Sequence, residues 1–481
     1  MKAKNILFPM GAAALAAGSA LAVKTAKLKK TLAPSAPAIA FTADEEEKYA
    51  HNLSEMVKIP TISRKEDESY EIFTAFQEKM AELFPITFAT LERHELNGNL
   101  LLRWRGKTEG GGIMLMGHQD VVPVDQSGWE KDPFSGEISD GKIWGRGAMD
   151  CKSTVCCEFC AVEELLAEGF EPEKDIWLFA SRNEENSGGG SERCSEYLEK
   201  LGIRLDMVMD EGGAVVDGVF PGLKTPCSAV GVVEKGFCDV KFIARGNGGH
   251  ASTPSRHTPI ARLADFVSEV DKKSPFKKEY NEPVPEMLAA VTPYLPFYLR
   301  LVTGNMNIFG GVLKKVLPLV SAEGGAFIST TAAFTMSGGS TASNVLPDEA
   351  YVICNIRPSV TQNAEESIDI LRKIAAKHDV DTEVLMARDA SPVSPTNSEE
   401  FKYLTRCINE CLPDTIALPY LMTGGTDSRQ FYNICDNVLR FTPTRLTGEQ
   451  LAAMHAANEN IDTAALAEGV KFYKYMIANR K

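Results

Sequence analysis

The chain has 481 residues, which predicts about three structural units at roughly 150 residues per domain. Its composition, 44% hydrophobic and 24% charged, is that of a globular protein and excludes a largely disordered or fibrous chain. Asp and Glu (65) outnumber Lys and Arg (51), and the net charge is −14. Because an acidic protein has no global field that attracts phosphate, we expect no nucleic-acid partner.

The N-terminal segment 1–43 differs from the rest, because it carries six lysines and no acidic residue. Residues 5–23 are apolar apart from Asn5 and Ser19, and the stretch is just long enough to span a bilayer. The run Ala20-Leu21-Ala22 also resembles a signal-peptidase site, although more lysines follow the stretch than precede it. We favour a membrane anchor or signal anchor; a cleaved signal and a surface-lying tail are the alternatives.

The eleven cysteines form no regular disulfide framework. Four of them crowd one predicted helix without the second CxxC pair of a zinc knuckle, namely Cys151, Cys156, Cys157 and Cys160. We expect reduced, apolar core residues, since a thiol enzyme would need a Cys–His pair in a cleft. Free thiols suit a reducing compartment, which favours a membrane-anchored protein whose body faces that side, with a cytoplasmic or an exported protein as alternatives.

The first folded segment is predicted at 44–233, after a Pro- and Ala-rich linker. Apolar runs at 112–116 and 175–180 are typical of strands buried on both faces. They alternate with helices predicted at 45–57, 69–83 and 153–168. This alternation indicates an α/β domain built on a parallel sheet.

A second, smaller unit is predicted at 234–392. Its expected elements follow a β-α-β-β-α-β order with both helices on one face; they include strands at 237–244, 351–354 and 382–386 and helices at 259–271 and 364–378. A Pro-rich, aromatic stretch near 274–328 is interpreted as an insertion, and the α/β pattern returns in 393–481. The predicted fold class is therefore an α/β domain interrupted by a smaller α+β domain.

Polar residues follow the predicted buried strands. His118 and Asp120 come after the first strand, at the edge where open α/β sheets bind ligands. A neutral imidazole is a metal ligand, and a nearby carboxylate fixes its tautomer. Glu184 and Glu185 follow the next strand, where two adjacent acids repel each other unless a cation lies beside them. Taken alone, each pair is more often an ordinary polar loop.

Three further motifs complete the set. Asp150 ends the glycine-rich run Gly145-Arg146-Gly147-Ala148-Met149-Asp150, where it could bridge two cations or cap a helix. Asp210 and Glu211 end another strand-like run, and His455 stands near the C-terminus. Together these residues predict an open site for two metals that share one carboxylate.

These five motifs, with Gly424-Gly425-Thr426-Asp427-Ser428-Arg429, resemble the M20 family of zinc aminoacylases and carboxypeptidases over about residues 44–481. Within it, the chain is most similar to the branch of carboxypeptidase S and the N-acyl-amino-acid hydrolases. The resemblance implies a zinc-peptidase-like catalytic domain and two Zn²⁺ ions per chain, for which Co²⁺ or Mn²⁺ could substitute.

The resemblance also implies a role for each residue. His118 and Asp150 would bind the first ion, and the bridging Asp150 would bind the second with Glu185 and His455. The remaining ligand of the first ion is Asp210 or Glu211, with a slight preference for Glu211. Asp120 would orient His118, and Glu184 would act as the general base.

By the same resemblance, the smaller unit is a lid or dimerisation domain. Its His250, in Gly249-His250-Ala251-Ser252, would reach the site of a neighbouring subunit in a homodimer and stabilise the oxyanion; a core or surface role is the alternative. Asn344 and Arg357 are candidates to hold a substrate carboxylate, with Arg429 as a rival. Ser359 and Val360 stand where the family often has a glycine, which weakens the case for Arg357.

The expected reaction is hydrolysis of an amide next to a free amino-acid carboxylate, by a carboxypeptidase or an N-acyl-amino-acid hydrolase. A dipeptidase or biosynthetic deacylase is the alternative, and a non-catalytic relic would lack a ligand or the base, none of which is missing. The insertion either lines a lipid or peptide tail or forms an extra helical pair packed on the lid, and its residues of interest are Tyr294, Phe297, Tyr298, Leu299 and Leu301.

Overall fold

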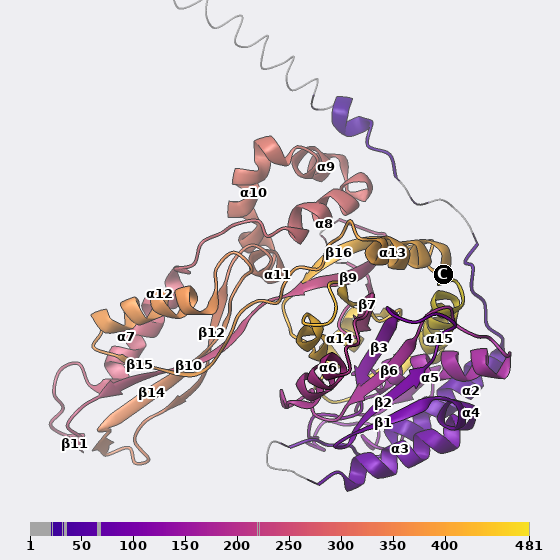
Figure 1. Cartoon of the computed structure of the whole chain (residues 1–481). Helices are drawn as coiled ribbons and strands as arrows, with labels where there is room; N and C mark the ends of the chain where they lie inside the picture. Colours follow the sequence, from indigo (N-terminus) through magenta and orange to yellow (C-terminus); the bar gives the residue numbers. More distant parts are fainter. Residues whose placement is uncertain are drawn as a thin grey trace, which may run out of the picture.

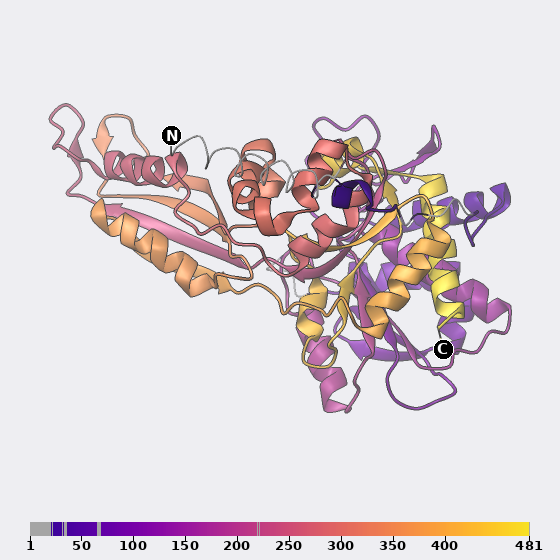
Figure 2. The ribbon, with the colours of Figure 1, turned by 90° about the horizontal axis from the view of Figure 1, so that it is seen from above.

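The computed structural model describes residues 21, 23–30, 32, 36–64, 69–218, 220 and 222–480. A large α/β domain surrounds a ten-stranded sheet, and a smaller domain built on a four-stranded sheet projects from it (Figures 1 and 2). This arrangement confirms the predicted fold class. The apolar stretch 5–23 lies almost wholly outside the described residues, and none of the described helices is long and apolar enough to cross a membrane.

The large sheet is mixed, so the expectation of a parallel sheet is wrong. Its strand order is β1-β2-β6-β3-β7-β17-β9-β8-β18, with β16 paired to β9. β3, β6, β7 and β17 run parallel, but β1 and β2 form an antiparallel hairpin beside β6. The hairpin turns at Asn97 and Gly98, whose φ values of 50° and 81° are those of a tight two-residue turn. The bounds are β1 Glu92–Leu96, β2 Asn99–Trp104, β3 Ile113–His118, β6 Ile176–Ser181, β7 Met207–Asp210, β8 Val215–Val216, β9 Cys227–Glu234, β16 Ile416–Met422, β17 Val438–Arg440 and β18 Arg445–Leu446.

Helices cover both faces of this sheet, because successive side chains of its central strands point to opposite sides. In β3, Ile113 and Leu115 join the core under α5, whereas Met114 and Met116 join the core under α6. α2, α5 and α15 pack together on the first face. The helices of this domain are α2 Ala43–Val57, α3 Glu71–Leu83, α4 Pro85–Thr90, α5 Lys152–Ala167, α6 Gly190–Lys200, α13 Glu399–Cys411, η2 Asp427–Phe431, α14 Gly448–Ala453 and α15 Thr463–Ala478.

A small three-stranded sheet ties the C-terminal part of the chain to the middle of the domain. Its strands are β4 (Ile138–Ser139), β5 (Lys142–Trp144) and β19 (Asn460–Asp462). Asn460 pairs with Trp144. The loop before β19 is thereby held beside the glycine-rich segment that follows β5.

The smaller domain has an antiparallel sheet of order β12-β14-β10-β15, with α7 and α12 on one face (Figure 1). Burial alternates along β14, as expected for a sheet with one covered face. Strand β12 was not recognised as a strand from the sequence. A two-stranded ribbon of β11 and β13 lies at the far end of the domain (Figure 1). The bounds are β10 Phe237–Arg245, β11 Gly249–His250, α7 Pro259–Lys272, β12 Thr331–Gly338, β13 Val345–Leu346, β14 Glu349–Arg357, α12 Ala364–Lys377 and β15 Asp381–Arg388.

The inserted stretch is helical and packs on the large domain. Met287 and Leu288 of α8 share the core of Ile416 and Leu418 in β16, so α8 covers that strand. The expectation of a helical pair packed on the lid is therefore wrong, because the apolar face of α8 matches the edge of the large sheet. The elements are α8 Pro283–Val291, η1 Thr292–Tyr294, α9 Phe297–Thr303, α10 Met306–Val320 and α11 Ala322–Ala326.

Candidate metal centre

The site is built where three neighbouring parallel strands end. β3 pairs with β6 so that His118 lies opposite Ser181, and β3 pairs with β7 on its other side. The chain therefore leaves all three strands at one edge of the sheet, which is the ligand-binding edge of open α/β folds. His118 ends β3, Glu184 and Glu185 follow β6, and Glu211 follows β7.

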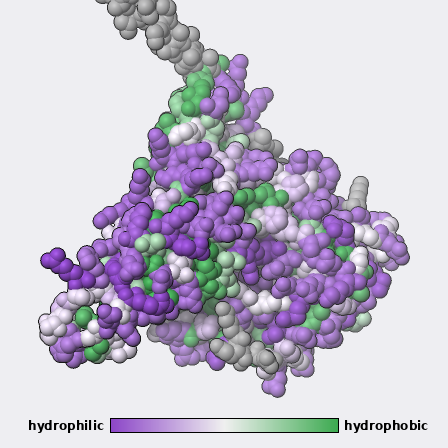
Figure 3. All heavy atoms as spheres, turned by 60° about the vertical axis from the view of Figure 1, so that its left-hand side comes forward, coloured by the Kyte–Doolittle hydropathy of each residue, from purple (hydrophilic) through white to green (hydrophobic). Residues whose placement is uncertain are grey.

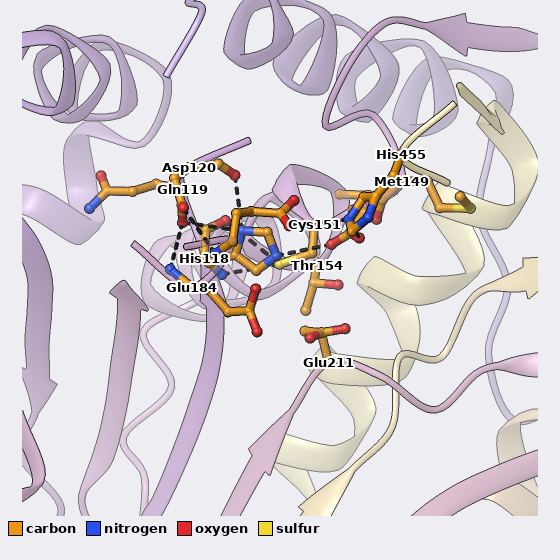
Figure 4. Close-up of polar contacts among 12 residues, drawn as sticks. His118, Gln119, Asp120, Met149, Cys151, Thr154, Glu184, Glu211 and His455 are labelled. Atoms are coloured by element: carbon orange, nitrogen blue, oxygen red, sulfur yellow. Dashed lines mark hydrogen bonds and ion pairs between the residues drawn. The ribbon is translucent and has the colours of Figure 1, made fainter. Parts of the chain in front are cut away.

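The carboxylate of Asp150 lies between two imidazoles. Its Oδ1 atom is 2.9 Å from Nε2 of His118, and its Oδ2 atom is 3.1 Å from Nε2 of His455. The Oε2 atom of Glu185 also lies 3.1 Å from Nε2 of His455. The ligand atoms of Asp150, Glu185 and His455 all lie within 4.8 Å of one another. Figure 4 shows His118 and His455 with Glu184 and Glu211 close by.

Asp120 positions its neighbours through hydrogen bonds. Its side-chain oxygens accept the backbone N–H groups of Glu184 and Glu185, each at 3.2 Å, and the Ser63 hydroxyl at 2.5 Å. Nδ1 of His118 donates to the carbonyl oxygen of Asp120 at 2.9 Å. In the neutral ring this bond leaves the lone pair on Nε2, which is the atom that faces Asp150.

Asp210 and Glu211 have different surroundings. Both side-chain oxygens of Asp210 accept backbone N–H groups, one from Glu211 and one from Ser428, each at 2.9 Å. Glu211 lines a cleft with Asp150 and Thr154 instead, and its carboxylate turns toward the site in Figure 4. Glu211 thus faces the cleft of the cluster, whereas Asp210 holds two loops together.

Burial disfavours the charged forms of Glu184 and Glu211 in this cluster. Burial, with Asp150 and Asp210 close by, raises the pKa of Glu211 well above its ordinary value. Burial also raises the pKa of Glu184. The Oε1 atom of Glu185 is buried and has no hydrogen-bond partner among the described residues. Two imidazoles, a shared carboxylate and a buried acceptor without a donor are a donor set that fits two divalent cations.

Glu459 holds the loop of Asp150 and was not among the expected site residues. Its Oε1 atom accepts the backbone N–H groups of Met149 and Asp150, and its Oε2 atom lies 2.5 Å from the Arg146 guanidinium. All of these groups are buried or nearly so. The sequence feature that could have pointed to Glu459 is its position four residues after His455.

The cysteines are buried in the protein interior. All eleven are free and buried, and burial raises the pKa of Cys156 and Cys157 well above the ordinary value. Cys151 lies closest to the centre, where its sulfur accepts the backbone N–H of His118 at 3.0 Å. These thiols are packed as core residues.

His250 and Asn344 lie side by side at the far end of the smaller domain, away from the metal centre (Figure 1). Both are exposed. Nδ1 of His250 accepts the backbone N–H of Ser252 at 3.1 Å, so the neutral ring carries its proton on Nε2. The structure therefore does not bring these residues to the metal centre of their own chain.

Arg357 and Arg429 lie near the junction of the two domains. The Arg357 guanidinium stacks on the Phe237 ring at 4.6 Å, and burial lowers its pKa. Arg429 donates to the carbonyl oxygen of Asp389 at 2.7 Å and lies 3.5 Å from Glu234. Glu234 is also paired with the buried Arg440 at 2.8 Å, so Arg429 belongs partly to a structural ion cluster.

Comparison with known protein families identifies the family of the chain. The model of peptidase family M20/M25/M40 matches residues 114–479. The chain belongs to this family. It is an M20 enzyme of the metallopeptidase and amidohydrolase class, as the motifs predicted.

Its relatives include both kinds of protein that were expected from the sequence, an N-acyl-amino-acid hydrolase and carboxypeptidase S. The chain is 32% identical to the N-fatty-acyl-amino acid synthase/hydrolase PM20D1 of Xenopus tropicalis, over 90% of this chain and 86% of that protein. It is 26% identical to carboxypeptidase S of Saccharomyces cerevisiae, over 88% of this chain and 83% of that protein. The predicted resemblance is thus confirmed.

Solved M20 structures share the fold. An M20 metallo-carboxypeptidase from Sulfolobus solfataricus has a TM-score of 0.63 at 19% identity and covers 89% of this chain and 98% of its own. The Bacillus subtilis YXEP protein, described as a dinuclear metal binding peptidase of the M20 family, has a TM-score of 0.55 at 13% identity and covers 91% and 98%. Family M20 therefore includes dinuclear metal peptidases.

Proposed function

We propose that this M20 enzyme is a two-zinc amidohydrolase that cleaves an amide bond next to a free amino-acid carboxylate, as a carboxypeptidase or an N-acyl-amino-acid hydrolase. The observation that carries the proposal is the position of Asp150. Each of its two oxygens faces a different imidazole, at 2.9 Å and 3.1 Å. A carboxylate in this position can bridge two cations, each of which keeps further ligands of its own.

One ion would be held by His118, Asp150 and Glu211, and the other by Asp150, Glu185 and His455. When bound, zinc polarises an amide carbonyl and lowers the pKa of water. Glu184 is the group that would accept and return a proton, since its carboxylate lies beside the cluster (Figure 4). Its raised pKa suits transfer of that proton to the leaving amine.

The smaller domain supports a homodimer in this proposal. The exposed Nε2–H of His250 is a free donor at the far end of that domain, where it is suited to an oxyanion in the site of a second subunit. The neighbouring Asn344 would bind the substrate carboxylate in the same site of the second subunit. Arg357 and Arg429 are cations near the domain junction that could receive a substrate carboxylate.

The test combines metal analysis with a substrate panel. About two zinc ions per purified chain are expected. The panel pairs N-acyl amino acids and dipeptides with matched amides whose terminal carboxylate is replaced by a carboxamide, and compares kcat/KM. We expect the free carboxylate to be required. Equal turnover of the carboxamides, or a chain that takes up no metal, would show the proposal to be wrong, and dipeptides as the best substrates would indicate the dipeptidase alternative.

A further inference from the structure

Helix α10 exposes a row of large apolar side chains. Ile308, Val312, Val316 and Leu319 are between 40% and 84% exposed. Their spacing of four, four and three residues places them on one face of the helix. The exposed row runs from near the start of the helix to its last turn.

The opposite face of α10 is apolar as well. Met306, Leu313 and Leu317 pack against the core of the large domain. A surface helix normally carries polar residues on its outer face, so an exposed apolar row is unusual. The exposed row is therefore a surface for something outside the described chain.

Neighbouring residues extend this surface. Phe297 and Tyr298, at the start of α9, are more than half exposed. Tyrosine is enriched where a protein meets the interface of a bilayer. Phenylalanine occurs on the apolar face of helices that lie in that interface. We call these two residues and the exposed row of α10 the α9–α10 surface.

The N-terminal segment is fastened to the same helices. Asn305 Nδ2 donates to the Thr25 hydroxyl at 3.2 Å, and the backbone N–H of Leu32 donates to the Tyr294 hydroxyl at 2.8 Å. Residues 23–28 accordingly lie next to α9 in both ribbon views (Figures 1 and 2). Figure 3 shows hydrophobic residues gathered at this end, where the described chain begins. The described residues 24–28, which follow the apolar stretch in the sequence, therefore lie beside the α9–α10 surface.

The charge around this surface is mostly positive. Residues 297–320 include Arg300, Lys314 and Lys315 and no acidic residue, and the described start of the chain adds Lys24, Lys27, Lys29 and Lys30. The exception is Glu323 in α11, which packs against α10. Such a basic cluster on a protein of net charge −14 is a local exception. A second copy of the same surface would bring like charges together, whereas anionic lipid headgroups would complement them.

We propose that the α9–α10 surface, together with Lys24, Lys27, Lys29 and Lys30, lies on the surface of an anionic lipid bilayer. Ile308, Val312, Val316 and Leu319 enter the boundary between headgroups and acyl chains, and the lysines contact the headgroups. This inference goes beyond the proposed function and does not depend on it, since it concerns the end of the molecule formed by the insertion.

The experiment places a probe on the surface in the full-length chain. Because all eleven native cysteines are buried, a Val312→Cys variant can be labelled selectively with a polarity-sensitive fluorophore. With phosphatidylcholine vesicles that contain phosphatidylserine, we expect a blue shift and quenching by bromine-labelled acyl chains. Pure phosphatidylcholine and high salt should reduce both signals. Leu201→Cys, at an exposed leucine after α6 in the large domain, is the matched control and should show neither.

A second variant separates this surface from the apolar N-terminal stretch. Val312→Glu with Leu319→Glu should weaken vesicle binding of the unlabelled full-length chain about tenfold or more. If the chain binds vesicles but the fluorophore at position 312 shows neither a blue shift nor quenching, the binding belongs to the N-terminal stretch alone. That result would overturn the proposal. A blue shift that needs no vesicles and rises with protein concentration would identify a second protein chain as the partner, which also overturns it.

Discussion

The Oε1 atom of Glu459 lies 3.0 Å from the backbone nitrogen of Asp150. Its other oxygen is paired with the buried Arg146. In Glu459→Ala the buried guanidinium would lose its carboxylate partner, and we expect a loss of about 3–5 kcal/mol in the free energy of unfolding. Metal affinity should fall about 10–100-fold, because Asp150 loses its support. Denaturant unfolding and a metal titration measure the two effects, with the exposed Glu449→Ala as control. An unchanged unfolding midpoint would contradict the role given to Glu459.

Replacement of Glu184 by Gln should remove the proton acceptor and leave the shape of the site unchanged. We expect kcat to fall at least about 10²-fold, while the metal content stays the same because Glu184 is not an expected ligand. Steady-state kinetics and metal analysis of the same preparation measure both. Glu192→Gln, an exposed glutamate in α6, is the matched control and should behave as wild type. Full turnover by Glu184→Gln would remove this residue from the mechanism.

Asp210 and Glu211 can be told apart by two variants of similar shape. Glu211→Gln should lose tight binding of one metal ion with a small effect on folding. Asp210→Asn should keep both ions but lose about 1–3 kcal/mol of stability, since one of its two backbone donors, Glu211 or Ser428, is left without an acceptor. Metal stoichiometry after dialysis and urea unfolding distinguish them. The reverse result would make Asp210 the ligand.

Glu45 should make stability depend on pH. A hydrogen bond from Lys471, supported by the Thr42 cap, lowers the pKa of Glu45 from 4.5 to about 2. The folded state therefore binds this proton less readily than the unfolded state. The stabilisation is complete above about pH 4.5 and is lost as the pH falls toward 2. We expect the difference in unfolding free energy between wild type and Glu45→Gln to shrink across that window. Glu47→Gln, on the exposed side of α2, should show no such change.

The proposed dimer predicts complementation between two inactive variants. His250→Ala should lower kcat and keep its metals, because the ring lies away from the metal centre of its own chain. If each site combines Glu184 of one subunit with His250 of the other, a random mixture with Glu184→Gln contains one intact site in each mixed dimer. Activity should then recover to about a quarter of wild type. Co-expression with two affinity tags provides the mixture, and no recovery in purified mixed dimers would place His250 outside the site.

The site could be predicted because its chemistry lies at the ends of buried strands. His118 ends an apolar run and Glu211 follows another, so the sequence pattern already placed them at one edge of a sheet. The choice between Asp210 and Glu211 could not be made in the same way. It depends on Ser428, a donor from a distant segment whose position follows only from the packing of the whole domain.

The errors in the fold have similar causes. The hairpin of β1 and β2 carries an Asn97-Gly98 pair, which is a strong turn signal, but its apolar residues were not recognised as strands. Packing of the insertion on the lid was one of two alternatives, because helix patterns show which face is apolar and not which surface covers it. Met287 and Leu288 pack against β16, a strand that comes much later in the sequence.

Strand β17 lies between β7 and β9 in the large sheet, although it is made from the last part of the chain. During synthesis, β7 and β9 leave the ribosome well before β17, and the edge of β7 stays unpaired until then. The sheet of the smaller domain comes entirely from residues 237–388 and is complete earlier. A nascent chain therefore passes through a stage with one finished domain and one open sheet. Premature termination before β17 would release a protein that tends to aggregate, rather than a soluble but inactive enzyme.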